Sequence, residues 1–254
     1  MNISVATYSY RHLINRGWTF EKIAGILKQL DIEYVEINNK FTTPERLPSD
    51  VQMFKDNGIK TILLTIDGNN YFQRWKGRRR KQFNFMKQWI DAADASDVRL
   101  IRANMGYHRN TSKFEKAFKK FRATFQPILE YCEEKGITHT FENHGSISSN
   151  VDFQIYVKEH LKSENYGYLV DTGNYKPKSD IYENIGKLGD SIKIVHAKMY
   201  EFDEVGDETK LDFRHIIEEL RKIGYNGYLS IEYEGSLPDR EGEEKSLELL
   251  KKVL

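Results

Sequence analysis

Thr138-His139-Thr140-Phe141-Glu142 is the first of four segments in the second half of the chain that decide its predicted fold. The other three are Tyr168-Leu169-Val170-Asp171, Ile192-Lys193-Ile194-Val195-His196 and Tyr228-Leu229-Ser230-Ile231-Glu232. Each is an apolar or β-branched run, typical of a buried strand, that stops at a residue able to bind a metal ion. Buried strands seldom end in a charged residue unless that residue is paired or bound to metal. Four such endings in succession therefore predict a single divalent-metal site.

The four residues at these strand ends form a mixed ligand set of three carboxylates and one imidazole. They are Glu142, Asp171, His196 and Glu232. A carboxylate-rich set of this type suits a fairly hard ion such as Mn²⁺, Mg²⁺ or Co²⁺, with Zn²⁺ as a further candidate. One divalent metal ion is therefore the expected cofactor. For either glutamate alone, the alternative is an ion pair with a neighbouring Lys or Arg.

Strand-like and helix-like segments alternate along the whole chain. The predicted strands are residues 3–6, 34–37, 61–66, 99–103, 138–142, 167–171, 193–196 and 228–232. The predicted helices are residues 19–30, 44–57, 79–96, 112–135, 151–161, 181–188, 213–223 and 241–254. Glycine follows three of these helices directly, as is common at helix C-termini, at Gly58, Gly136 and Gly224. This alternation predicts a parallel sheet with right-handed crossovers.

The length favours a closed barrel. The chain has 254 residues, close to the roughly 250 that are typical of a single barrel of this kind. We predict an α/β protein with one domain, residues 1–254, and the (β/α)8 TIM-barrel architecture. An open dinucleotide-binding sheet is disfavoured because no glycine-rich phosphate loop follows the first predicted strand. The four proposed ligands then fall at the C-terminal ends of strands five to eight, the face that carries barrel active sites.

Composition excludes several classes of protein. The formal net charge is +1, so no overall electrostatic attraction to nucleic acid or membrane is expected. No apolar run approaches the roughly 18 residues that indicate a membrane span. Cys132 is the single cysteine, which rules out an intramolecular disulfide and is typical of a reducing compartment. The first residues lack the basic and apolar regions of a signal peptide, so we expect a soluble cytoplasmic protein.

The motifs at these strand ends resemble those of the xylose-isomerase-like TIM-barrel superfamily, over essentially the whole chain. That superfamily includes sugar and sugar-phosphate isomerases and epimerases, dehydroshikimate dehydratases and endonuclease IV. Its pattern places Glu, Asp, His and Glu after strands five, six, seven and eight. The matching motifs are Phe141-Glu142-Asn143-His144-Gly145, Val170-Asp171-Thr172-Gly173-Asn174, Val195-His196-Ala197-Lys198, Ser230-Ile231-Glu232-Tyr233-Glu234-Gly235 and Gly224-Tyr225-Asn226-Gly227. These motifs are specific for the superfamily rather than for one reaction.

Two features separate the chain from particular branches of that superfamily. The epimerase branch usually has a His three residues after the strand-six Asp, whereas this chain has Asn174. Endonuclease IV binds three metals and uses many more histidines, whereas this chain has seven in total. A nucleic-acid substrate is therefore disfavoured, and no membrane partner is expected.

The resemblance implies a divalent-metal-dependent isomerase or epimerase of a small sugar or sugar-like hydroxy-carbonyl compound, with proton transfer through a metal-stabilised enediolate. A shorter resemblance supports a lyase instead. The segment Thr7-Tyr8-Ser9-Tyr10-Arg11-His12, with Ile101-Arg102, Glu142-x-His144 and His196-x-Lys198, is similar to metal-dependent dehydroshikimate dehydratases. A non-catalytic sugar-binding barrel is the third hypothesis. Each implies a small carbohydrate-like partner, and homo-oligomers are common among such barrels.

Three residues are predicted to be catalytic. In the isomerase and epimerase branch, the two glutamates matched by Glu142 and Glu232 also move the proton, one on each face of the substrate. In the alternative, both are ligands only and His144 is the base. His144 lies two residues after Glu142, on the same side of an extended strand. There it would act as a base, bind substrate or orient Glu142.

Five residues are predicted to bind substrate: Arg102, Lys198, Tyr8, His12 and Asn174. Tyr8 and His12 follow the first strand and would form part of the pocket wall, with a helix-capping or loop role as the alternative for His12. Asn174 occupies the position of the histidine in the epimerase branch.

The two predicted substrate-binding cations each have a structural alternative. Arg102 would clamp substrate oxygens from the end of strand four, or form a salt bridge with Glu142 or Glu36. Lys198 would neutralise an anionic group of the substrate, or pair with Glu232 or Glu234. Glu36, at the end of strand two, is predicted to support a metal ligand rather than to be one.

Lys76-Gly77-Arg78-Arg79-Arg80-Lys81 is the densest basic run and follows the aromatic-rich segment Tyr71-Phe72-Gln73-Arg74-Trp75. The simplest interpretation is a solvated helix start. Basic residues there oppose the helix dipole, so an anionic ligand or an acidic partner is the alternative. A lid over the barrel mouth is a further interpretation of the aromatic segment.

Overall fold

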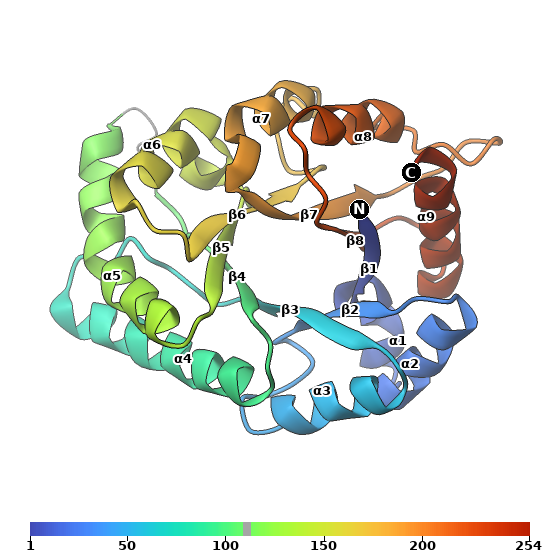
Figure 1. The fold of residues 1–254 in the computed structure, drawn as a ribbon, viewed down its shortest axis with the longest axis horizontal. Coiled ribbons are helices and arrows are strands. Elements are labelled where there is room, and N and C mark those ends of the chain that lie inside the picture. The colour runs from blue at the N-terminus through green and yellow to red at the C-terminus, as the bar shows by residue number, and fades with distance from the viewer. Residues whose placement is uncertain (109–112) are drawn as a thin grey trace.

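Eight parallel strands close into a barrel in the order β1 to β8, with helices around the outside (Figure 1). The computed structural model describes residues 1–108 and 113–254. The strands are β1 Asn2–Ala6, β2 Tyr34–Asn38, β3 Lys60–Ile66, β4 Leu100–Asn104, β5 Thr138–Glu142, β6 Tyr166–Asp171, β7 Ile192–Met199 and β8 Tyr228–Tyr233. The described α-helices are α1 Arg11–Asn15, α2 Phe20–Gln29, α3 Leu47–Asp56, α4 Lys76–Ala95, α5 Phe114–Glu134, α6 Val151–Leu161, α7 Asp180–Leu188, α8 Phe213–Lys222 and α9 Asp239–Val253. The predicted (β/α)8 TIM barrel is confirmed.

The barrel closes through β1, which pairs with both β2 and β8. Val5 lies opposite Val35 on one side and opposite Ile231 on the other. Asn2 lies opposite Tyr228, so the first strand pairs with the last along almost its whole length. Residues far apart in the sequence thus share one side of the mouth, which brings β8 next to the segment that follows β1.

The predicted strands are all present, with shifts at some ends. The largest shift is in β7, which continues past His196 to Met199. Ala197 and Met199 are fully buried, so burial rather than a charged residue sets the end of this strand. Helix α4 begins at Lys76, earlier than predicted, and the short helix α1 was not predicted. The predicted helix 112–135 corresponds to α5, and its predicted first residue, 112, lies outside the described residues.

The outward face of β5 packs into an aromatic cluster. His139 and Phe141 are fully buried beside the rings of Tyr71 and Phe125. The Tyr71 hydroxyl lies 3.2 Å from Nε2 of His139, and burial lowers the pKa of this imidazole to about 3. His139 is therefore a core residue. Because side chains alternate along a strand, Glu142 faces the other way, into the barrel.

A second apolar cluster fills the barrel below the mouth. It consists of Ile62, Leu63, Leu169 and Ile194. Leu169 and Ile194 stand two residues before Asp171 and His196, and therefore share their side of the sheet. This apolar layer lies beneath the polar layer at the C-terminal ends of the strands.

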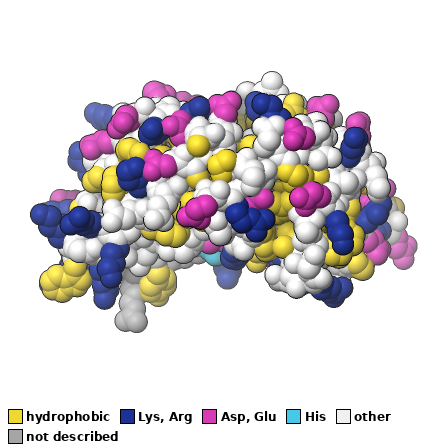
Figure 2. Space-filling view, turned by 90° about the horizontal axis from the view of Figure 1, so that it is seen from below, with side chains coloured by type: hydrophobic (Ala, Val, Ile, Leu, Met, Phe, Trp, Pro, Cys, Tyr) yellow, Lys and Arg dark blue, Asp and Glu magenta, His cyan; other side chains and the backbone are white. Residues whose placement is uncertain are grey.

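The outer surface carries a mixture of charges. Figure 2 shows the side on which α3 and α4 lie, with acidic and basic side chains interspersed over it. Four residues of the basic run are exposed over the first turns of α4: Lys76, Arg78, Arg80 and Lys81. Within residues 1–108 and 113–254, no helix combines the length and the apolar character required to cross a bilayer.

One carboxyl group is buried away from the barrel mouth. Glu243 on α9 is fully buried, and neither of its side-chain oxygens has a hydrogen-bond partner. The Ser9 hydroxyl lies nearby but donates to the carbonyl of Ile231 at 3.1 Å. Burial raises the pKa of Glu243 well above its ordinary value of 4.5. The folded protein therefore favours the neutral acid.

Glu243→Gln is expected to stabilise the protein at pH 8 but not at pH 4. Because the folded pKa exceeds the unfolded one, this group destabilises the fold progressively as pH rises above the unfolded value. Glutamine is neutral at every pH and avoids that loss. The midpoint of thermal unfolding should rise by a few degrees at pH 8, since about 1 kcal/mol corresponds to roughly 2–4 °C at this chain length. The exposed Glu248→Gln on the same helix is the control; equal shifts at both pH values would contradict the prediction.

Candidate metal and substrate site

The four predicted ligands converge at the mouth of the barrel. One ligand atom from each of Glu142, Asp171 and His196 lies within 4.8 Å of the others, and all three side chains are buried. Glu232 completes the group, with Oε2 3.5 Å from Nδ1 of His196. The register explains this convergence, because Asp171 of β6 pairs directly with His196 of β7. Residues that are separated in the sequence therefore lie close together once the strands pair.

The buried ligand atoms of these four residues fit a cation. Four of these atoms form no hydrogen bond of normal geometry: Glu142 Oε2, Asp171 Oδ2, His196 Nδ1 and Glu232 Oε2. The three carboxylate oxygens instead form ion pairs with Arg102 and Lys198, which shows that this group requires positive charge. Three carboxylate oxygens and one imidazole nitrogen are also the donor types that Mn²⁺, Co²⁺ and Zn²⁺ accept. The residues present therefore fit one divalent ion.

The second imidazole nitrogen of His196 is fixed by Glu36 of β2. Glu36 Oε2 lies 2.8 Å from His196 Nε2 and also accepts a hydrogen bond from the Ser230 hydroxyl at 3.0 Å. The Thr65 hydroxyl donates to the other oxygen of Glu36 at 3.0 Å. This arrangement leaves Nδ1 of His196 facing Asp171 and Glu232. A carboxylate in this place orients a histidine ligand and raises its basicity.

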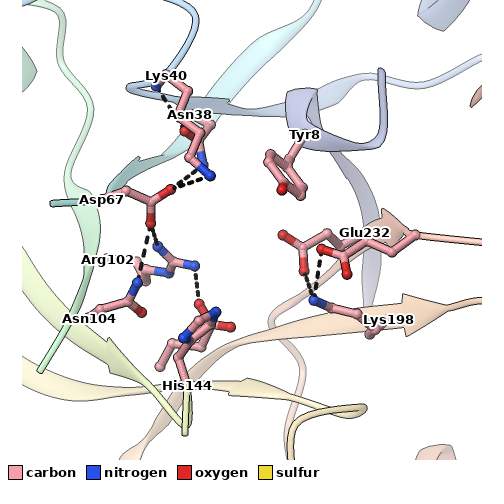
Figure 3. Close-up of a pocket in the computed structure, with 11 residues that line it drawn as sticks. Tyr8, Asn38, Lys40, Asp67, Arg102, Asn104, His144, Lys198 and Glu232 are labelled. Atoms are coloured by element: carbon pink, nitrogen blue, oxygen red, sulfur yellow. Dashed lines mark hydrogen bonds and ion pairs between the residues drawn. The ribbon is translucent and has the colours of Figure 1, made fainter. Parts of the chain in front are cut away.

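The ammonium of Lys198 lies among the same carboxylates. Its Nζ is 2.6 Å from Glu232 Oε2, 3.1 Å from Asp171 Oδ2 and 3.2 Å from Glu234 Oε1 (Figure 3). The first two are the oxygens that would face an ion. The lysine thus supplies the positive charge that this part of the site requires. The alternative predicted for Lys198, an ion pair with Glu232 or Glu234, is present with both glutamates, and Asp171 joins it.

Arg102 plays the corresponding part at Glu142. Its guanidinium forms ion pairs with Glu142 Oε2 and, at 2.8 Å, with Asp67 Oδ1. Burial opposes ionisation of Glu142, but Arg102 and then His196 outweigh it and hold its pKa below the ordinary value. Of the two predicted salt-bridge partners of Arg102, the structure has Glu142; Asp67 takes the place of Glu36.

The remaining carboxylates differ in how readily they ionise. Burial, partly offset by Lys198, raises the pKa of Asp171 to about 7. Burial acts in the same direction on Glu232, but Lys198 and His196 outweigh it and hold the pKa of Glu232 well below its ordinary value. Full ionisation of Asp171 at neutral pH therefore requires more positive charge than Lys198 provides. A divalent ion between these groups would supply it.

A cavity of about 180 Å³ opens above this group. It is lined by Tyr8, Asn38, Lys40, Asp67, Arg102, Asn104, Glu142, His144, Lys198, Glu232 and Glu234. Figure 3 shows two walls, with Asp67, Arg102 and Asn104 facing Lys198 and Glu232 across the space. Of the predicted catalytic and substrate-binding residues, Glu142, Glu232, His144, Arg102, Lys198 and Tyr8 are among the lining residues. The structure thus assembles two predicted roles, metal ligation and substrate contact, around one space.

Two predicted substrate-binding residues lie elsewhere. His12 is on α1, with its side chain 57% exposed and Nδ1 2.7 Å from Asp239 Oδ1 at the start of α9. The other oxygen of Asp239 accepts from the backbone N–H of Leu13 at 2.9 Å. His12 therefore joins α1 to α9, as in its alternative role. Asn174 does not line the cavity; its Nδ2 donates to Glu142 Oε1 at 2.8 Å, so it positions a ligand.

The lining residues that were not predicted come mainly from the first half of the chain. They are Asn38, Lys40, Asp67, Asn104 and, directly after β8, Glu234. Asn38 and Asn104 end β2 and β4, and Asp67 directly follows β3. A polar residue at the end of an apolar strand is the same signal that pointed to the four candidate ligands.

Lys198→Met is expected to strengthen binding of Mn²⁺ by about tenfold, because the ammonium no longer competes for Asp171 and Glu232. The same change should lower the metal-free melting temperature, since buried carboxylates lose their partner. Calorimetric titration with Mn²⁺ and thermal unfolding in chelator measure the two effects. Lys193→Met, on the same strand but pairing with a backbone carbonyl, is the control. Unchanged or weaker Mn²⁺ binding by Lys198→Met would show that the lysine does not occupy the ion's place.

Comparison with known proteins places the chain in a family. A family model described as xylose isomerase-like TIM barrel matches residues 14–253. The solved D-allulose 3-epimerase from Methylomonas sp. superimposes with a TM-score of 0.81 at 14% identity, covering 100% of this chain and 98% of that one. A probable 3-DHS dehydratase from Bacillus anthracis gives 0.79 at 13% identity, covering 99% of each chain. At these identities the likeness establishes the fold.

Among curated proteins, the match is local. The C-glycoside deglycosidase alpha subunit of Arthrobacter globiformis is 45% identical over 58 residues, which are 23% of this chain and 16% of that protein. The chain spans less than half the length of each curated relative that it matches.

Proposed function

The chain belongs to the xylose isomerase-like TIM-barrel family, and on that premise we propose that it is a divalent-metal-dependent isomerase or epimerase. Its substrate is a small sugar or sugar-like compound with a hydroxyl next to a carbonyl. The solved proteins of similar fold include sugar epimerases and a dehydratase, which supports an enzyme acting on a small carbohydrate.

Glu142, Asp171, His196 and Glu232 would hold the ion, with Mn²⁺, Mg²⁺ or Co²⁺ as the preferred metals. When bound there, a divalent ion would polarise the carbonyl and make the neighbouring C–H more acidic. Glu36 fixes the ring of His196, and Asn174 fixes one oxygen of Glu142. The metal ligands are thus held in place by neighbouring side chains.

Glu142 and Glu232 are the proposed proton carriers. Their pKa values lie below the ordinary range because of the cations beside them, so both are carboxylates at neutral pH and able to accept a proton. Glu142 ends β5 and Glu232 lies in β8, so they approach the cavity from separate parts of the barrel. One would remove the proton next to the carbonyl to give an enediolate, and the other would return it.

One observation carries this proposal: both glutamates belong to the ligand group and also line the substrate cavity. A carboxylate that only bound metal would need no access to that space. Glu142 and Glu232 have it, although each is at most 5% exposed. Groups that reach both the candidate ion position and the substrate are the ones able to transfer a proton.

A lyase is the second candidate, and it is favoured by the placement of His144. This side chain lines the cavity beside Glu142 and adds a third group able to move a proton. Asn174, where the epimerase branch has a histidine, favours the same alternative. In this reaction, loss of a proton next to the carbonyl would be followed by loss of a β-hydroxyl as water.

The test is an NMR experiment in D₂O. Neutral aldoses and ketoses, and separately 3-dehydroshikimate, are incubated with the Mn²⁺-loaded protein. The protein and metal are then removed, and the small molecules are examined by NMR. Deuterium at the carbon next to the carbonyl supports the isomerase or epimerase. A product that has lost one water and gained one carbon–carbon double bond relative to its substrate supports the lyase and overturns the first proposal. Binding without either change would establish a non-catalytic sugar-binding barrel and overturn both.

A further inference from the structure

One wall of the cavity has no part in metal binding. It comes from the ends of β2, β3 and β4 and is here called the Asp67 wall, defined as Asn38, Lys40, Asp67 and Asn104. Figure 3 shows these side chains turned toward one another across the cavity from Glu232. None belongs to the four candidate ligands, so the wall is available to bind the part of the substrate that does not react.

Asp67 is the centre of this wall. Its Oδ1 accepts from Arg102 at 2.8 Å and from Asn104 Nδ2 at 3.3 Å, and its Oδ2 faces Lys40 Nζ at 3.3 Å and Asn38 Nδ2 at 3.5 Å. Its backbone N–H donates to the side chain of Asn39 at 2.9 Å. A carboxylate held from so many sides is fixed in position. Its side chain remains 22% exposed, which leaves it open to a ligand.

The charges around the cavity leave no cation for an anionic substrate. Of the described residues lining the cavity, the cations are Lys40, Arg102 and Lys198, and each already faces at least one carboxylate. Four carboxylates line the same space, and Asp171 lies just behind it. One divalent ion added to the three cations would balance these five negative charges. A phosphate or carboxylate on the substrate would bring a further negative charge, which the cations lining the cavity do not balance.

The wall instead offers acceptors for hydroxyl protons. Asn104 Oδ1 is buried without a hydrogen-bond partner, and Asn104 lines the cavity. An unpaired buried acceptor is costly unless a ligand donates to it. A sugar hydroxyl can donate to Asn104 or Asp67 and at the same time accept from Asn38 or Lys40. A phosphate dianion has no proton to give.

We propose that the Asp67 wall is the subsite for the hydroxyl-bearing end of an uncharged sugar, and that it excludes phosphorylated and carboxylated substrates. The reacting end of that sugar is assigned by the function proposed above. The recognised class is therefore the free polyhydroxylated carbonyl compound, and 3-dehydroshikimate, a carboxylate, falls outside it.

The experiment measures binding rather than turnover. Mg²⁺-loaded protein is titrated calorimetrically with D-fructose, D-tagatose and D-allulose, and with D-fructose 6-phosphate and 3-dehydroshikimate. At least one free sugar should bind, and about tenfold or more tightly than either anion, a ratio that corresponds to one lost charge-assisted contact. The proposal is overturned if either anion binds as tightly as the free sugar of highest affinity. It is also overturned if no free sugar binds.

Two variants locate the selectivity. Asp67→Asn should weaken binding of the free sugar by about tenfold and reduce the preference over D-fructose 6-phosphate, because it removes both an acceptor and a negative charge. Asn104→Leu removes the unpaired acceptor and one hydrogen bond to Asp67 but no charged group, and it should weaken binding of the free sugar similarly. Asp56→Asn, exposed on α3, is the control. Unchanged affinity in both wall variants, each shown to be folded by its thermal transition, would overturn the subsite.

The binding and exchange experiments fail independently. If an anion binds best while deuterium exchange still occurs, the wall is wrongly assigned and the proposed function stands. If free sugars bind selectively through Asp67 while nothing exchanges, the subsite stands and the catalytic proposal falls.

Discussion

Glu142→Gln and Glu232→Gln are each expected to lower turnover by about 10²–10⁴-fold at saturating metal, the range typical of a lost general base. Glutamine keeps the size of the side chain and one coordinating oxygen but has no basic oxygen to take a proton. Each residue is at most 5% exposed, so the change is confined to the site. Initial rates on the substrate found by deuterium exchange, with metal content checked by elemental analysis, measure the effect.

The comparison with His144→Asn separates the two reactions. In an isomerase or epimerase, His144 only binds substrate or orients Glu142, so its loss should cost less than either glutamate variant. In a lyase with a histidine base, the order reverses and His144→Asn abolishes proton loss. Glu130→Gln, exposed on α5, is the control for a change of charge alone. Near-normal turnover in all three variants would place the chemistry outside this site.

The convergence of the four candidate ligands could be predicted because a signal in the sequence and a property of the fold coincide at each of them. An apolar strand followed by a charged residue is visible in the sequence, and parallel strands in a barrel place such residues on one face. The register then brings Asp171 and His196 directly opposite one another without further information. What the local signal cannot supply is the direction of a longer side chain.

Arg102 illustrates that limit. Its strand and its role as a cation at the mouth follow from the sequence, and Glu142 was one predicted partner. The second partner is Asp67 rather than Glu36, because Glu36 is already bonded to His196, Ser230 and Thr65. Competition among three polar groups for one carboxylate depends on side-chain positions in three dimensions, and no sequence interval encodes it.

The predicted place of His12 in the pocket wall was wrong for a different reason. It follows β1 on the side of the chain that leads to the mouth, which is why it was placed in the pocket wall. The short helix α1 turns it toward Asp239, a residue of α9 near the other end of the chain. The contact exists because β1 and β8 are neighbours in the closed barrel.

Asp67 was not predicted to line the site, although the sequence carries a signal for it. It directly follows the apolar strand β3, just as the candidate ligands stand at the ends of their strands.

His196→Ala is expected to remove most of the metal affinity, and activity with it. The imidazole is the only nitrogen ligand in the candidate set, and its loss leaves three carboxylates to repel one another around a weakened site. In the original chain, elemental analysis should give about one divalent ion per chain, and Mn²⁺ at 100 times its dissociation constant should add about 2.7 kcal/mol to the stability. The variant should show neither at the same concentration.

Glu36→Gln provides the matched comparison, because it changes the residue that orients the imidazole and keeps the imidazole itself. Loss of such a partner typically lowers metal affinity by about 10–100-fold. The metal affinity of Glu36→Gln should therefore lie between those of the original chain and His196→Ala. Both changes disturb one buried pair, since His196 and Glu36 are hydrogen bonded at 2.8 Å and at most 1% exposed. If the two variants lose similar stability without metal but differ strongly in metal affinity, the lost affinity of His196→Ala comes from the missing ligand and not from disturbed packing. Full metal content and activity in His196→Ala would mean that strand seven contributes no ligand.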